Sequence, residues 1–115
     1  MLYKKDDMNL NNKIELITLF DYYSGLLTDK QRGALKLYLI EDLGITEIAQ
    51  NLNITRQATY DLINVATASL RQTEGKLGLI KSNSLAKKEL DAILSDSSLT
   101  KSQILNKIKS IKENL

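Results

Sequence analysis

The sequence predicts an all-α protein, with a helix-turn-helix bundle over residues 1–80 and a two-helix extension over residues 81–115. Apolar residues recur at the spacing of a helix face along most of the chain, and no strand-like alternation of convincing length interrupts them. Short polar segments rich in Ser, Thr, Asn and Gly separate the periodic stretches, as expected between helices. A length of 115 residues accommodates one domain with a helical appendage.

The composition excludes several kinds of chemistry. The chain contains neither Cys nor His, so it has no thiolate nucleophile, disulfide, zinc finger or imidazole acid–base catalyst. Pairs of neighbouring acidic residues occur, but no base, metal-ligand partner or phosphate-binding glycine loop accompanies them. We therefore expect no enzymatic activity, no catalytic residue, no cofactor and no bound metal.

The N-terminal segment lacks the apolar region of a signal peptide, because Lys4 and Lys5 are followed at once by Asp6 and Asp7. No stretch approaches the ~18 uninterrupted apolar residues that a transmembrane helix needs. We therefore expect a cytoplasmic protein without a membrane partner. The absence of Cys fits a reducing compartment.

Positive charge is concentrated in the C-terminal third of the chain. Residues 1–75 carry 8 basic and 10 acidic side chains, whereas residues 76–115 carry 8 Lys and 4 acidic residues. Lys and Arg side chains that neutralise phosphates supply most of the non-specific affinity for nucleic acids. The part of the chain that resembles a recognition module is therefore the acidic part.

The first segment predicts two helices. Residues 10–24 present an apolar face wide enough for a core helix, which ends at Ser24 and Gly25. Thr28 and Gln31 have the spacing of a capping box, in which each side chain accepts a hydrogen bond from the backbone of the other. The helix that follows is expected to run to about Ile40.

A helix-turn-helix pattern follows. Thr46 is expected to cap its first helix, and Asn53 to make a sharp turn, because Asn tolerates the left-handed backbone conformation. Thr55 is expected to cap the second helix, over residues 56–73. The glycines that close this helix are Gly75 and Gly78.

The C-terminal extension predicts two further helices. Residues 82–84 are expected to form a hinge or cap that opens the first, and residues 95–98 to end it. Thr100 and Gln103 repeat the capping-box spacing. A regular apolar stripe then follows, consisting of Ile104, Ile108, Ile111 and Leu115. An isolated helix of this length is marginal in water, so the stripe should pack on its own domain or on a second copy, and a homodimer stays open.

The second helix of such a motif presents its first residues to base edges in the major groove. The exposed candidates are Thr55, Arg56, Gln57, Tyr60, Asp61 and Asn64. Arg and Gln have the donors that guanine and adenine edges accept, and Thr55 at the helix N-terminus suits a phosphate. Two basic residues beside the first capping box are further candidates for backbone contact or else ordinary surface charge, namely Lys30 and Arg32.

The same pattern is also a compact way to pack two helices. Asp61 repels phosphate, which favours a protein partner or a local bond to Arg56 or Arg71. A module that neutralises about two phosphates gains little at physiological salt. The charge distribution therefore disfavours direct DNA recognition and leaves RNA or protein as partners.

Several runs of the chain resemble the YlxM-like helix-turn-helix proteins of low-GC bacteria. They lie between about residues 14 and 80 and include Thr28-Asp29-Lys30-Gln31-Arg32 and Thr55-Arg56-Gln57-Ala58-Thr59-Tyr60-Asp61. The resemblance implies a module similar to the DNA-binding fourth region of bacterial sigma factors. It also implies a non-enzymatic accessory or regulatory role in the signal recognition particle pathway, through a protein or RNA component of the particle. The alternative is a DNA-binding transcriptional regulator.

The chain departs from the family pattern at two places. Residues 62–66 are mostly apolar where family members tend to carry basic residues. Thr59 stands where a larger β-branched apolar residue is usual. The first departure weakens a nucleic-acid surface on the second helix, and the second bears on the packing beneath it.

Overall fold

The computed structural model describes residues 10–115, so the predicted absence of a signal peptide concerns a segment outside the described residues. The described part of the chain is helical and contains no strand, which confirms the all-α prediction. Its elements are α1 (Leu10–Tyr23), the 3₁₀ turn η2 (Ser24–Leu26), α2 (Asp29–Leu35), the π-helical η3 (Lys36–Ile40), α3 (Ile45–Leu52), α4 (Arg56–Leu77), α5 (Leu79–Ser95) and α6 (Lys101–Glu113). Every helix in this part of the chain is too short or too polar to traverse a bilayer.

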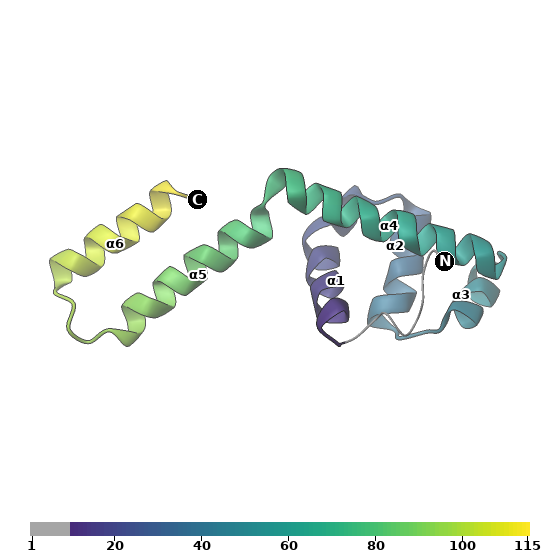
Figure 1. Cartoon of the computed structure of the whole chain (residues 1–115), viewed down its shortest axis with the longest axis horizontal. Helices are drawn as coiled ribbons and strands as arrows, with labels where there is room; N and C mark the ends of the chain where they lie inside the picture. The colour runs from purple at the N-terminus through teal and green to yellow at the C-terminus, as the bar shows by residue number, and fades with distance from the viewer. Residues whose placement is uncertain (1–9) are drawn as a thin grey trace. The chain divides into compact units, whose positions relative to one another are not determined.

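The chain divides into two compact units, one ending at Leu77 and the other beginning at Gly78. In the first unit the long helix α4 packs against α1, α2 and α3 (Figure 1). Its core has large side chains with almost no exposed surface, among them Leu35, Ile48, Ile63 and Leu70. Each of them comes from an amphipathic helix that buries its apolar face at helical spacing.

The first capping box is present as predicted. The backbone N–H of Gln31 donates to Thr28 Oγ1 at 3.2 Å, and the Thr28 N–H donates to Gln31 Oε1 at 3.0 Å. The helix does not continue regularly to Ile40, because a π turn replaces its second half and the Glu41 N–H donates to the Lys36 carbonyl. Asp42 then takes a left-handed conformation and pairs with Lys13 of α1.

Two predicted helix starts were wrong. Helix α3 begins at Ile45 with Gly44 as its N-cap, and Thr46 is not the cap. The reason is Glu47, whose carboxylate accepts the Gly44 N–H at 3.2 Å and so fixes the first turn earlier in the chain. Residues 82–84 lie inside α5 and form no hinge. The break lies at Gly78, whose φ of 64° suits glycine, and α5 starts directly after it.

The C-terminal end of α4 also differs from the prediction. The helix continues past Thr73 to Leu77, and Gly75 lies within it and does not close it. The predicted domain boundary between residues 80 and 81 falls inside α5. Whether residues 1–80 fold independently stays a prediction.

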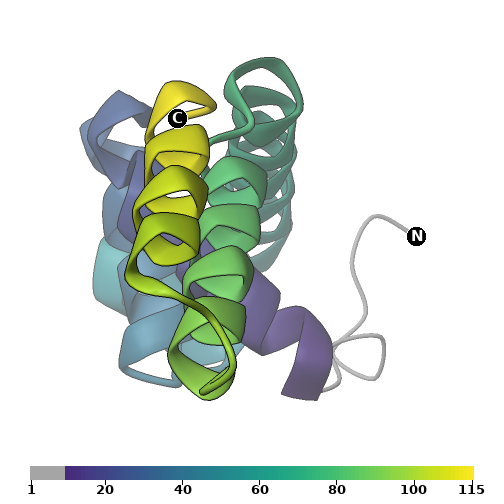
Figure 2. The ribbon, with the colours of Figure 1, turned by 90° about the vertical axis from the view of Figure 1, so that its left-hand side faces the viewer.

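The second unit is a hairpin of α5 and α6, which run side by side in opposite directions (Figures 1 and 2). Asp96 begins the connection, accepting the Ser98 N–H at 3.0 Å and the Ser98 hydroxyl at 2.5 Å, and these bonds lower the pKa of Asp96. The predicted capping box of Thr100 and Gln103 is present. Packing within the chain covers only part of the predicted apolar stripe, because Ile111 is 6% exposed but Leu115 is 70% exposed, and packing on a second copy stays a prediction.

Replacement of the core residue Leu35 by Ala should lower the free energy of unfolding by about 2–5 kcal/mol, because Leu35 has no exposed surface and the cavity left behind cannot fully collapse. Leu26→Ala is the matched control, since Leu26 is 69% exposed, and it should change stability by less than about 0.5 kcal/mol. Urea unfolding followed by circular dichroism measures both. Equal losses in the two variants would contradict the described core.

Candidate macromolecule-binding surface

A tight left-handed turn joins α3 to α4. Asn53 has φ 55° and ψ 48°, and its backbone N–H donates to the carbonyls of Ala49 and Gln50. The Ile54 N–H also donates to the Ala49 carbonyl, at 3.0 Å, so the last turn of α3 is closed by the residues that leave it. The predicted helix-turn-helix is confirmed, and this turn determines where α4 begins.

Thr55 starts α4 as its N-terminal cap. Its Oγ1 accepts the Ala58 N–H at 3.0 Å, and its carbonyl accepts both the N–H and the hydroxyl of Thr59, the latter at 2.9 Å. Thr59 is fully buried, so this hydrogen bond satisfies its hydroxyl inside the core. The hydroxyl that Thr59 places in the core is thus paired within its own helix.

The two residues with the strongest base-reading chemistry are exposed at the start of α4. Arg56 makes no hydrogen bond or ion pair within the described residues. The Gln57 side-chain amide donates to Asp61 Oδ1 one turn further on, at 3.0 Å. Of the two alternatives for Asp61, a protein partner or a local bond to Arg56 or Arg71, the structure does not form the local bond, because Asp61 accepts from Gln57 and Arg71 pairs with Glu15 of α1 at 3.2 Å. Gln57 and Asp61 form one polar group on the surface of α4.

Tyr60 and Asn64 are half-buried along the same helix. The pKa of Tyr38 is raised to about 12, mainly because Tyr38 is buried. The negative charge of Asp42 and the neighbouring Tyr60 raise it further. The Asn64 side-chain nitrogen is buried and has no hydrogen-bond partner. These two residues therefore mark the edge where the surface of α4 meets the core.

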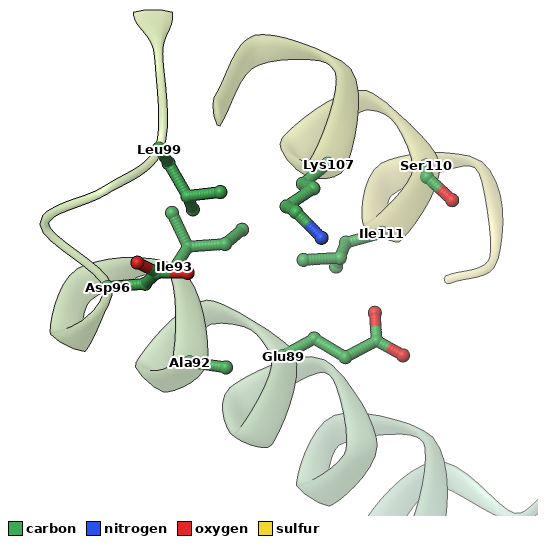
Figure 3. A pocket seen from close by; sticks show the side chains of 8 residues that line it. All are labelled: Glu89, Ala92, Ile93, Asp96, Leu99, Lys107, Ser110 and Ile111. Carbon is green, nitrogen blue, oxygen red and sulfur yellow. The ribbon is translucent and has the colours of Figure 1, made fainter. Parts of the chain in front are cut away.

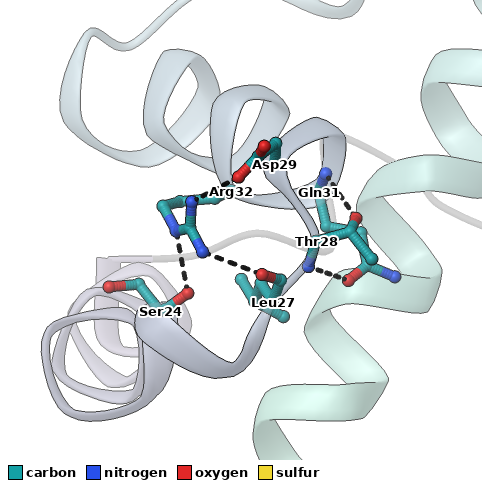
Figure 4. Close-up of polar contacts among 6 residues, drawn as sticks. All are labelled: Ser24, Leu27, Thr28, Asp29, Gln31 and Arg32. Atoms are coloured by element: carbon teal, nitrogen blue, oxygen red, sulfur yellow. Dashed lines mark hydrogen bonds and ion pairs between the residues drawn. The ribbon is translucent and has the colours of Figure 1, made fainter.

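Lys30 and Arg32 differ sharply from each other. Lys30 is exposed on α2. The Arg32 guanidinium instead closes the loop before its own helix, since Nε donates to the Ser24 carbonyl at 3.0 Å and Nη2 to the Leu27 carbonyl at 2.8 Å. Its Nη1 pairs with Asp29 at 2.9 Å, and Figure 4 shows all three contacts. The sequence interpretation missed this bridging role, for which the Asp29–Arg32 spacing was a weak signal.

A long-range contact was also missed. The Tyr23 hydroxyl donates to Glu74 Oε1 at 2.5 Å and so ties the end of α1 to the last turns of α4. Tyr23 is 2% exposed, so the bond also satisfies a buried hydroxyl. Nothing in the sequence pairs residues 51 positions apart.

The surface around the turn is polar but nearly uncharged. Between Ile45 and Asn64 the charged side chains are Glu47, Arg56 and Asp61. The exposed amides that accompany them are Gln50, Asn51, Asn53 and Gln57. Among the residues that the structure describes, no group of three or more carboxylates that could hold a metal ion was found. The surface offers hydrogen-bond donors and acceptors, with a single positive charge.

A left-handed turn joins α3 to α4, and α4 presents an exposed polar surface. This arrangement defines the class of helix-turn-helix binding proteins. Residues 10–111 match the family described as "Putative helix-turn-helix protein, YlxM / p13 like". The chain belongs to this family. Membership supports a regulatory or binding role, with nucleic acid or protein as the partner.

Individual relatives align with a shorter part of the chain. A UPF0122 protein of Thermoanaerobacter sp. (strain X514) is 43% identical over 75 residues, which are 65% of this chain and 64% of that protein. One of Desulforamulus reducens is 41% identical over 83 residues, or 72% of this chain and 69% of the relative. The UPF0122 protein YlxM of Bacillus subtilis (strain 168) is 42% identical over 74 residues, or 64% and 67%. The chain thus spans less than two thirds of the Thermoanaerobacter protein.

Asn53→Ala should lower the free energy of unfolding by about 1 kcal/mol, because a residue with a Cβ and no compensating side-chain bond is disfavoured in the left-handed conformation. Asn53→Gly should stay within about 0.5 kcal/mol of the parent, since Gly adopts that conformation freely. Thermal and urea unfolding measure the difference. A more stable Ala than Gly variant would contradict the described turn.

Arg32→Lys should destabilise the chain by about 1–2 kcal/mol, because an ammonium group cannot span the two carbonyls and the carboxylate that the guanidinium fork contacts. Lys30→Gln, two positions away on an exposed side chain, should change stability by less than about 0.5 kcal/mol. Urea unfolding measures both. If Lys at position 32 is tolerated as well as Gln at position 30, the bridging role is refuted.

Proposed function

We propose that this protein is a non-enzymatic accessory or regulatory protein of the signal recognition particle pathway, which binds a protein or RNA component of the particle. The pathway is supported by the resemblance to YlxM-like proteins, and the binding role by family membership. One observation carries the choice of partner: the first turns of α4, which a DNA-binding motif would insert into the groove, are exposed but carry a single basic residue, Arg56.

The electrostatics of the surface argue against a duplex partner. A protein that holds DNA neutralises several phosphates at once, each with a Lys or Arg. Here Arg56 is the single cation between Ile45 and Asn64, and Asp61 lies one turn and a half further along the same exposed region. Residues 62–66 add no basic side chain. Non-specific attraction to a phosphate backbone would therefore be weak at physiological salt.

The amides around the turn suit a partner that presents its own hydrogen-bonding groups. Gln50, Asn51 and Asn53 are exposed on α3 and the turn, and Gln57 follows on α4. A folded protein surface or the unpaired bases of an RNA loop offers such groups, and binding them requires fewer phosphate-neutralising cations than binding a duplex does. A cytoplasmic location belongs with this proposal.

Purified protein should shift the reconstituted particle, or its receptor, on a native gel at micromolar concentration and low salt. In a native lysate the tagged protein should retain a component of the pathway, and parallel ribonuclease treatment assigns the contact to RNA or to protein. Arg56→Ala with Gln57→Ala should weaken retention by about tenfold or more. Gln72→Ala with Lys76→Ala, exposed on the last turns of α4, is the matched control.

No shift of particle or receptor under these conditions would refute the proposal. Equal weakening by both double variants would show that the residues after the turn are not the specific contact surface.

The alternative is a transcriptional regulator, and it is favoured by the exposed and unpaired guanidinium of Arg56. Under that alternative, duplex binding would be sequence-selective and steeply dependent on salt. Arg56→Ala would then relax specificity at one base position, at a cost of about 1–3 kcal/mol. Absent or salt-insensitive binding to duplex DNA removes this alternative.

A further inference from the structure

The hairpin of α5 and α6 leaves large aliphatic side chains uncovered. Between Gly78 and Leu115 the buried side chains are Ile93 and Ile111, which are 9% and 6% exposed. By contrast, Leu94 near the end of α5 is 85% exposed, and Leu105 within α6 is 57% exposed. Clustered exposed apolar side chains of this size mark an interaction surface.

These side chains fall into two stripes of helical spacing. On α5 the stripe consists of Lys87, Leu90 and Leu94, and on α6 it consists of Lys101, Leu105, Ile108 and Lys112. All seven residues are exposed. In each helix the stripe lies one residue C-terminal to the residues that face the other helix. On α5 Leu94 follows the buried Ile93, and on α6 Lys112 follows the buried Ile111.

The two stripes share one face of the hairpin. Two antiparallel helices are related by an approximate two-fold axis perpendicular to the plane that contains both. A rotation about this axis exchanges the two helices but does not exchange the two faces of the pair. Residues displaced in the same rotational direction from the contact line therefore lie on the same face. We call this face, made of the seven residues of the two stripes, the leucine face.

The opposite side of the hairpin has different chemistry. There a cavity of about 300 Å³ lies between the helices, and Figure 3 shows Glu89 and Lys107 reaching toward it from the two sides. Asp96 and Ser110 also line it. This side therefore carries both signs of charge and small polar groups. Leu85 and Leu115 are also exposed, outside the two stripes, at the other end of the hairpin.

The charges on the leucine face all have one sign. Its ionisable residues are Lys87, Lys101 and Lys112, and neither stripe contains a carboxylate. A second copy of the chain would bring the same three lysines against them, and like charges that face each other are unfavourable. The complementary partner presents an apolar ridge flanked by carboxylates.

We propose that the leucine face docks an amphipathic helix of another protein, whose apolar ridge is bordered by Asp or Glu. Leu90, Leu94, Leu105 and Ile108 would cover that ridge, as two side-by-side helices do when they accept a third. The lysines at the ends of the stripes would pair with the acidic borders and fix the orientation. This surface is made by residues other than those of the helix-turn-helix, so the inference stands independently of the proposed function.

Two fluorescent helical peptides test the proposal on the full chain. Both carry Leu at i, i+4, i+7 and i+11, and their flanking positions are Glu in one peptide and Lys in the other. Fluorescence anisotropy should show that the Glu peptide binds at least ~10-fold more tightly. Lys101→Glu with Lys112→Glu should invert this preference, whereas Lys36→Glu, an exposed lysine of α2–η3, should not.

The apolar part of the proposal has its own variants. Leu94→Gln with Leu105→Gln should weaken binding of the Glu peptide by at least ~10-fold at an unchanged melting temperature. Leu26→Gln, at a similarly exposed leucine of the first unit, should leave binding unchanged.

Four results would overturn the proposal. In the first, the Glu peptide fails to bind or binds no better than the Lys peptide. In the second, sedimentation shows a dimer that Leu94→Gln dissociates. In the third, phosphatidylglycerol vesicles bind through the same leucines in place of the peptide. In the fourth, the melting temperature of the Leu94→Gln variant falls, which would mean that the face is already covered within the chain.

Discussion

The first unit depends on the burial of one face of α4. Thr59, Ile63, Ala66 and Leu70 recur along that face at spacings of three and four residues, and each is almost fully buried against the shorter helices. A helix of eight residues such as α3 has little stability by itself, so its position is determined by this contact. The small side chain of Ala66 and the internally bonded Thr59 let the neighbouring helices approach closely.

Burial of one face of α4 fixes the other. Once Ile63 and Thr59 face inward, Gln57 and Asp61 must face solvent, because a helix turns about 100° per residue. Arg56, three residues before Thr59, lies nearer the buried side and is exposed at the first residue of the helix. The turn at Asn53 adds the second constraint, since it sets where the helix starts and therefore which residues occupy its first turn. The candidate surface thus follows from the core and the turn together. No separate stabilising feature is required to expose it.

Local signals were predictable from the sequence, and long-range ones were not. The capping boxes at Thr28 and Thr100 and the left-handed Asn53 depend on residues a few positions apart, so their spacing predicts them. The start of α3 was missed because Thr46 and Gly44 are both acceptable caps, and only the position of Glu47 decides between them. The roles of Arg32 and Tyr23 depend on backbone carbonyls and a distant Glu74 that only the folded chain brings near.

The distribution of charge gives the two units different capacities. A polar surface with one free cation, around Arg56, gains affinity mainly from shape and directed hydrogen bonds, which discriminate between partners but attract them weakly at long range. The hairpin has the opposite character, because its exposed leucines and lysines would attract an apolar, acidic partner through burial and long-range charge. A protein built from both gains selectivity from one unit and attraction from the other, since two weak contacts on one chain reinforce each other through effective concentration. Such a combination suits an accessory factor that associates with a larger assembly, and it does not need a strongly basic recognition helix.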